Sequence, residues 1–167
     1  MSVLAPAVGA VIAAIVESSV LTHLQVGGLR PDLVFAVGVA LAMVLGFESS
    51  MTWAFVGGLT LDLLLPGRSL GSTALALVLV TAMALLVARV TWPPRLVVIA
   101  ATSFGLSLVY QVLLLGLLAL TENVAFLGLS VTDLVLVGLL DAAITAVAVV
   151  VVRAIDLRFG ERERLAW

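Results

Sequence analysis

The chain has 167 residues, of which 63% are hydrophobic and 11% are charged, and its mean hydropathy is +1.34. A soluble domain carries about 25% charged residues, so this chain has too little polar surface for a water-soluble globule. It contains eight arginines, ten acids and one histidine, but no lysine and no cysteine. This inventory excludes disulfides, lysine or thiol nucleophiles and the usual zinc ligand sets, and the long apolar runs predict an all-α integral membrane protein.

The first predicted membrane span covers residues 3–21. A signal peptide is the alternative, which the lack of a basic residue in the opening Met-Ser-Val-Leu disfavours. Gly9, Ala13 and Glu17 recur at a spacing of four, so two small residues and one acid share a helix face. Small residues let another helix approach closely, and a carboxyl group at this depth needs a partner or a cavity. Glu17 is therefore a candidate site residue.

Two short apolar segments follow, at about 33–47 and 51–65, and the other helices are predicted to assemble around them. Pro31 suits the first turn of a helix, and Asp32 favours its positive end. At 1.5 Å per residue the first segment reaches only about 22 Å, less than a hydrocarbon core of about 30 Å. We interpret the two segments as short, tilted spans; the alternative is a re-entrant hairpin shielded by other helices. The polar residues 48–50 are predicted to form the turn between them.

The second short segment combines a glycine pair, Gly57 and Gly58, with a lone acid, Asp62, among leucines. The glycines indicate a helix-packing surface, used either inside the chain or with another protein. Acids inside membrane spans are costly and usually mark function. Asp62 is therefore a second candidate site residue.

Three longer spans are predicted at about 70–88, 96–120 and 133–152, before a basic tail at 153–167. Basic residues concentrate in cytoplasmic loops. Six spans with an internal N-terminus place six arginines inside and two outside, so we expect both termini in the cytoplasm. Five spans would result if the short pair were a re-entrant unit, and the termini would then lie on opposite sides.

The last span repeats the small-residue pattern at Gly138 and Ala142, with Asp141 near its middle. Asp141 is the deepest predicted acid. It would reach Arg89 only if that arginine side chain extended inward along its helix. The pattern indicates another packing face, and Asp141 is a third candidate acid.

Under this topology several charged residues lie toward the outer leaflet. They are Glu17, Arg30, Asp32, Asp62, Arg68 and Asp133. One interpretation is an outward polar pocket or docking site. The other is that Asp32 and Asp133 cap helices and the arginines contact lipid headgroups, which leaves only Glu17 and Asp62 to be explained by function.

The run P-D-L at residue 31, followed by G-F-x-x-S, G-G-L-T-L-D-L-L and S-L-G, resembles the bacterial rod-shape-determining MreD family. The motif falls on Pro31, Gly57, Gly58, Leu59, Asp62, Leu70 and Gly71, and more loosely on Glu17, Ser18 and Asp133. The resemblance implies a six-helix bundle in the bacterial plasma membrane, similar to the substrate-binding subunits of energy-coupling-factor transporters.

The resemblance also implies a non-enzymatic scaffold of the cell-elongation and peptidoglycan-synthesis machinery, without cofactor, metal or nucleic acid. Its expected partner is an MreC-like single-span protein, and through it MreB, RodA and a class B penicillin-binding transpeptidase. The alternative is a small-solute-binding subunit of an energy-coupling-factor-type transporter, with its pocket around Glu17, Asp62 and Tyr110. Only 6% of the chain is aromatic, which disfavours such a pocket. The candidate residues are Glu17, Pro31, Asp32, Gly57, Gly58, Asp62, Gly71, Gly138, Asp141 and Ala142.

Overall fold

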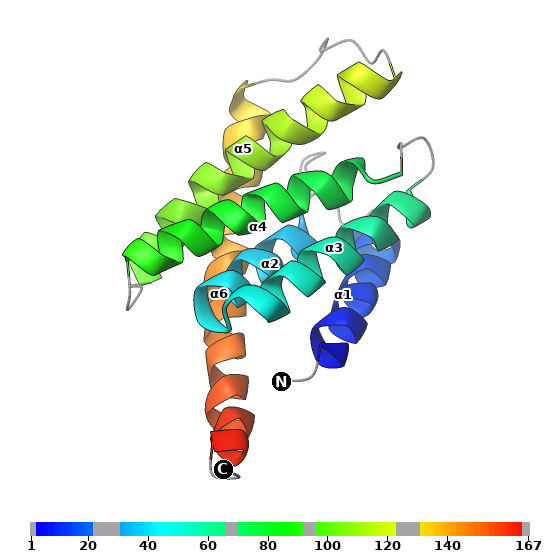
Figure 1. Ribbon diagram of the computed structural model, residues 1–167. Helices are drawn as coiled ribbons and strands as arrows, with labels where there is room; N and C mark the ends of the chain where they lie inside the picture. Colours follow the sequence, from blue (N-terminus) through cyan, green and yellow to red (C-terminus); the bar gives the residue numbers. More distant parts are fainter. Residues whose placement is uncertain (1–2, 22–30, 66–69, 92–95, 123–130, 165–167) are drawn as a thin grey trace.

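The computed structural model of the protein describes residues 3–21, 31–65, 70–91, 96–122 and 131–164. Every regular element in these ranges is helical (Figure 1). The elements are α1 (Leu4–Val16), the π-helical turn η1 (Glu17–Leu21), α2 (Leu33–Val44), α3 (Phe47–Leu64), α4 (Ser72–Val90), α5 (Leu96–Glu122) and α6 (Val131–Arg164). The all-helical arrangement is compatible with the predicted membrane helical bundle.

The centre of the fold is α2, which packs against each of the other five α-helices. Nine of its twelve residues are buried, from Val34 to Met43. The helix is apolar on all sides, as expected for one that neighbours surround. Of the two short segments around which the other helices were predicted to assemble, the first therefore lies at the centre.

Helix lengths differ widely around this centre. The segments that are long and apolar enough to cross a membrane, among the described residues, are Ser72–Val90, Leu96–Leu117 and Thr132–Asp156. By contrast, α2 rises only about 18 Å at 1.5 Å per residue. The 34 residues of α6 continue the last predicted span through the basic tail to Arg164, and in Figure 1 this end extends beyond the other helices.

The turn between α2 and α3 lies at Leu45 and Gly46, so the predicted polar turn at residues 48–50 is wrong. Gly46 has φ +88°, a left-handed conformation that glycine adopts without the steric cost of a side chain. Glu48 lies in the first turn of α3, and the Ser50 hydroxyl donates to the Gly46 carbonyl at 2.7 Å. A hydroxyl that is satisfied by its own helix does not break that helix.

The predicted start of α2 also differs from the structure. Pro31 precedes α2 instead of lying in its first turn, and Asp32 occupies the N-cap position without a side-chain capping bond. Asp133 does lie in the first turn of α6. Arg30 and Arg68, which were predicted to lie toward the outer leaflet, lie outside the described residues.

Candidate functional site

The acid of the motif, Asp62, closes the turn between α3 and α4. Its carboxyl oxygens accept hydrogen bonds from the backbone N–H groups of Gly71 at 2.9 Å, Thr73 at 3.2 Å and Ala74 at 3.3 Å. These groups lie at the start of α4, where the first N–H groups of a helix lack partners within the helix. Asp62 is only 4% exposed. It therefore caps a neighbouring helix from within the bundle.

The glycines of the motif belong to the same unit. Gly71 has φ +97°, which lets the chain turn into α4 and present its N–H to Asp62. A Cβ added to Gly58 would lie 2.4 Å from the Cα of Ala74, so α3 and α4 touch backbone to backbone here. Gly58, Asp62 and Gly71 thus have interlocking structural roles in one helical hairpin.

The start of α2 has acceptors from two other helices. The Val34 N–H donates to Oε2 of Glu17 at 2.8 Å, and the Asp32 N–H donates to Oδ1 of Asp141 at 3.0 Å. Glu17 follows α1, whereas Asp141 lies in α6 and is fully buried. A short helix that begins inside a bundle needs such acceptors because water cannot satisfy its first N–H groups.

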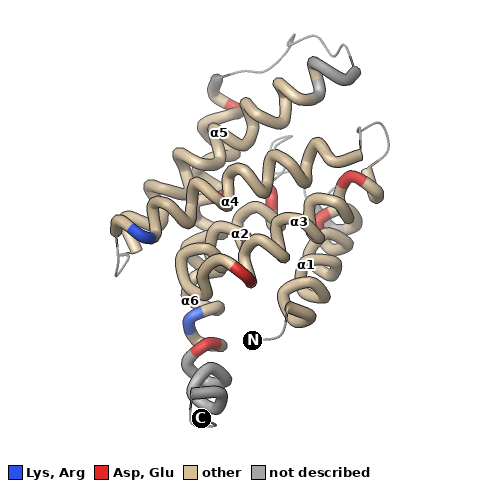
Figure 2. Tube along the Cα trace, viewed as in Figure 1, with Lys and Arg blue, Asp and Glu red and all other residues tan. Residues whose placement is uncertain are grey.

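Asp141 also joins α6 to α5. Its Oδ2 accepts a hydrogen bond from the Ser107 hydroxyl, to which the Gln111 amide donates at 3.2 Å. One helical turn away, the hydroxyls of Ser103 and Thr145 lie 2.7 Å apart. Charged residues are sparse along the chain (Figure 2), and this seam of buried polar side chains links α5 to α6.

Arg89 is not part of this seam. It lines a pocket with the C-terminal end of α2, whereas Asp141 bonds the N-terminal end of that helix. The two ends are about 18 Å apart at 1.5 Å per residue. The inward-reaching Arg89–Asp141 pair, which the sequence left open, is therefore absent.

Each of the residues around which the transporter alternative places its pocket, Glu17, Asp62 and Tyr110, has a structural contact of its own in the described part of the chain. Glu17 and Asp62 bond the starts of two different helices. Tyr110 is 1% exposed and its ring stacks on Phe35 at a centroid distance of 5.3 Å. The described residues contain no group of three or more His, Cys, Asp or Glu that could hold a metal ion.

The remaining glycines of the motif and stripes are packed inside the chain. A Cβ on Gly57 would lie 2.6 Å from Cγ1 of Val34, and one on Gly138 would lie 3.1 Å from the Phe104 ring. Ala142 is 8% exposed. Of the two alternatives for these surfaces, packing within the chain is the one that the contacts support.

Sequence reasoning missed Trp53. Its indole N–H donates to the Val34 carbonyl at 3.0 Å, and its ring lies against Gly9 of α1 and Gly38 of α2. A Cβ on Gly9 would lie 2.8 Å from the ring. The signal was available, because a tryptophan inside an apolar helix needs an acceptor for its N–H.

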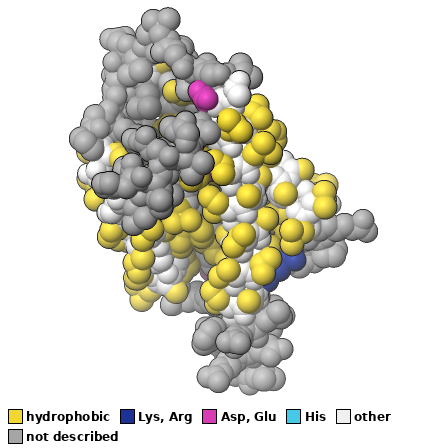
Figure 3. Space-filling model, turned by 180° about the vertical axis from the view of Figure 1, so that it is seen from behind, with side chains coloured by type: hydrophobic (Ala, Val, Ile, Leu, Met, Phe, Trp, Pro, Cys, Tyr) yellow, Lys and Arg dark blue, Asp and Glu magenta, His cyan; other side chains and the backbone are white. Residues whose placement is uncertain are grey.

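An apolar groove of about 450 Å³ lies between α1 and α6. Its floor is a row at a spacing of four, formed by Leu33, Val37 and Leu41 of α2 and by Leu45 just after that helix, and α6 supplies most of the opposite wall. Figure 3 shows the back of the molecule as it is drawn in Figure 1. On this side hydrophobic side chains cover α6. The other lining residues are Ala5, Pro6, Trp53, Ile144, Val147, Ala148, Val151, Val152 and Ile155.

No family model, curated protein or solved structure matches this chain.

Proposed function

We propose that this protein is a non-enzymatic membrane scaffold of the MreD type, and that the groove between α1 and α6 receives the transmembrane helix of a single-span, MreC-like partner. The observation that carries the proposal is the groove itself. It is continuous, lined by apolar side chains, and bounded by exposed residues such as Val147, which is 65% exposed.

A helix suits this groove better than a compact solute does. The floor follows one i, i+4 row of α2, so the groove runs along that helix as a helix–helix contact would. Ala5 and Ala148 line it from α1 and α6. Small side chains matter because helices in lipid associate by close packing, without a hydrophobic driving force between them.

The transporter alternative is weaker on the same contacts. Solute pockets present a few convergent polar groups to the ligand. Here Glu17, Asp62 and Asp141 are engaged by hydrogen-bond donors of the chain itself. The apolar groove offers a solute no comparable partners.

The proposal keeps the topology expected from the sequence: six crossings of a bacterial plasma membrane, with both termini in the cytoplasm. The long, continuous α6 then carries the basic C-terminal segment to the cytoplasmic side. In this arrangement the partner links the scaffold to MreB, RodA and a class B penicillin-binding transpeptidase. Arginines in short loops are the basis for the orientation.

The test is co-expression with the organism's MreC-like protein, followed by native mass spectrometry in detergent. Val147→Trp, which fills the groove, should abolish the complex. Val150→Trp is the matched control, since Val150 is a 55% exposed valine of α6 outside the groove. A complex that survives Val147→Trp, or that never forms with the wild-type protein, would contradict the proposal.

A further inference from the structure

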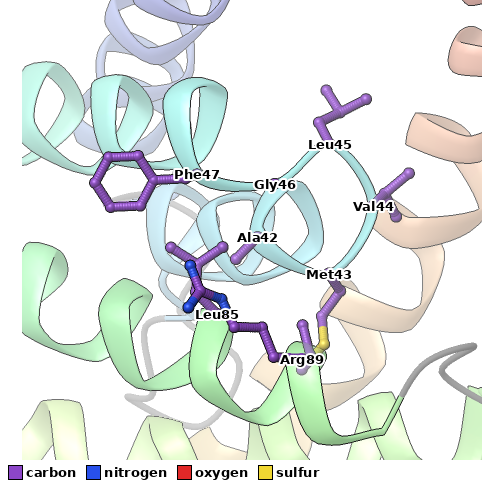
Figure 4. A pocket seen from close by; sticks show the side chains of 9 residues that line it. Ala42, Met43, Val44, Leu45, Gly46, Phe47, Leu85 and Arg89 are labelled. Atoms are coloured by element: carbon purple, nitrogen blue, oxygen red, sulfur yellow. The ribbon is translucent and has the colours of Figure 1, made fainter.

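A second pocket, of about 430 Å³, lies where the α2–α3 turn meets the C-terminal end of α4. Its lining comes from residues 42–47, which span the end of α2, the turn and the first residue of α3, and from Leu85, Ala88 and Arg89 of α4. Figure 4 shows Arg89 extending along α4 toward Leu85, beneath the turn. The pocket is separate from the groove assigned to the partner helix, although both include Leu45.

The polar side of this pocket is a guanidinium group. Arg89 is exposed and makes no hydrogen bond or ion pair with another described residue. A guanidinium group presents several N–H donors in a planar fork, which matches the oxygens of a phosphate in a bidentate contact. A lysine at this position would offer a point charge without that geometry.

The rest of the pocket is apolar. Met43 lines it from the end of α2, Phe47 from the start of α3 and Leu85 from α4. Phe47 is 62% exposed. Arg89 lies in the last turn of a helix that is long enough to cross a membrane. The pocket therefore places one cation at the end of a span and hydrocarbon walls beside it.

We propose that this pocket binds an anionic phospholipid, with the headgroup phosphate on Arg89 and the first part of an acyl chain against Phe47 and Leu85. Basic pockets between transmembrane helices bind anionic headgroups in this way. A free phosphate ion would use the guanidinium group but would gain nothing from the apolar wall. The proposal does not depend on the scaffold function, because it concerns a different surface.

The experiment is native mass spectrometry of the full chain, titrated separately with phosphatidylglycerol, phosphatidylcholine and inorganic phosphate. The wild-type protein should bind phosphatidylglycerol more tightly than phosphatidylcholine. Arg89→Gln should weaken phosphatidylglycerol binding about tenfold, the loss expected for one charge-assisted contact. Arg153→Gln, which removes the same charge outside the pocket, should leave the affinity unchanged.

A second pair of variants tests the apolar wall. Phe47→Ala should weaken phosphatidylglycerol binding several-fold, whereas Phe55→Ala should not, since Phe55 is 56% exposed on α3 outside the pocket. Equal binding of both lipids, or equal effects of the Arg89 and Arg153 variants, would overturn the proposal. Inorganic phosphate that competes with the lipid at similar concentration would overturn the assignment to a lipid.

Discussion

Replacing Asp62 by alanine tests whether this buried acid is a structural cap. The side chain accepts hydrogen bonds from Gly71, Thr73 and Ala74 at the start of α4. Asp62→Ala removes the acceptor but leaves the three N–H groups inside the bundle. Because Thr73 and Ala74 are buried there, we expect the α3–α4 hairpin to loosen and the whole fold to lose stability.

The size of this effect follows from the three lost hydrogen bonds. Hydrogen bonds between groups in membrane proteins average about 0.6 kcal/mol, and those in soluble proteins contribute about 0.5–1.5 kcal/mol. We therefore expect the free energy of unfolding to fall by about 2–4 kcal/mol. Asp62→Asn keeps one acceptor oxygen and should cost about half as much.

The assay is reversible unfolding in mixed micelles, in which dodecyl sulfate is titrated and helicity is followed by circular dichroism. Asp133→Ala is the matched control, because Asp133 is an exposed acid in the first turn of its own helix, α6. Its loss should cost no more than about 1 kcal/mol. If Asp62→Ala costs no more than Asp133→Ala, the α4 amides find other partners and Asp62 is not the cap.

Two further predictions concern packing around α3. Gly58→Ala should destabilise the protein strongly, since the added Cβ would lie 2.4 Å from the Cα of Ala74. The control Gly105→Ala should be neutral or slightly stabilising, because its added Cβ meets nothing within 4 Å. Unfolding midpoints in the same micelles check both variants, and equal midpoints would contradict the close packing of Gly58. Trp53→Phe should lower the free energy of unfolding by about 1–3 kcal/mol because the Val34 carbonyl loses its indole donor; an unchanged midpoint would show that this hydrogen bond contributes nothing.

The apolar helices were predictable because each is a run of hydrophobic residues bounded by polar or turn-forming ones. The short α2 was also predictable, since residues 33–47 are too few to cross the hydrocarbon as a straight helix. Its C-terminal boundary was not. The turn depends on the left-handed backbone of Gly46, whereas Glu48 and Ser50 appear polar enough to break a helix but remain within α3.

The acids of the apolar helices show where sequence reasoning stopped. Glu17, Asp62 and Asp141 were singled out as candidate acids, and the function of Glu17 and Asp62 was sought in a common outward pocket. All three accept hydrogen bonds from backbone N–H groups, which every residue except proline carries and which no sequence pattern marks. Asp141 also accepts one from the Ser107 hydroxyl. An acid is needed as an acceptor where a neighbouring helix begins inside the bundle, away from water. Where each helix begins relative to its neighbours is a property of the assembled fold.

The same requirement connects the acids to the proposed docking groove. Because α2 begins inside the bundle, its first N–H groups need acceptors from its neighbours, and Glu17 and Asp141 supply them. Glu17 directly follows α1, and Asp141 lies in α6. Their hydrogen bonds therefore fix α1 and α6, which form the walls of the groove, against α2, which forms its floor. Loss of either acid should therefore weaken partner binding without any contact between that acid and the partner. A groove-filling variant acts differently, because it should remove the complex while leaving the stability of the free protein unchanged.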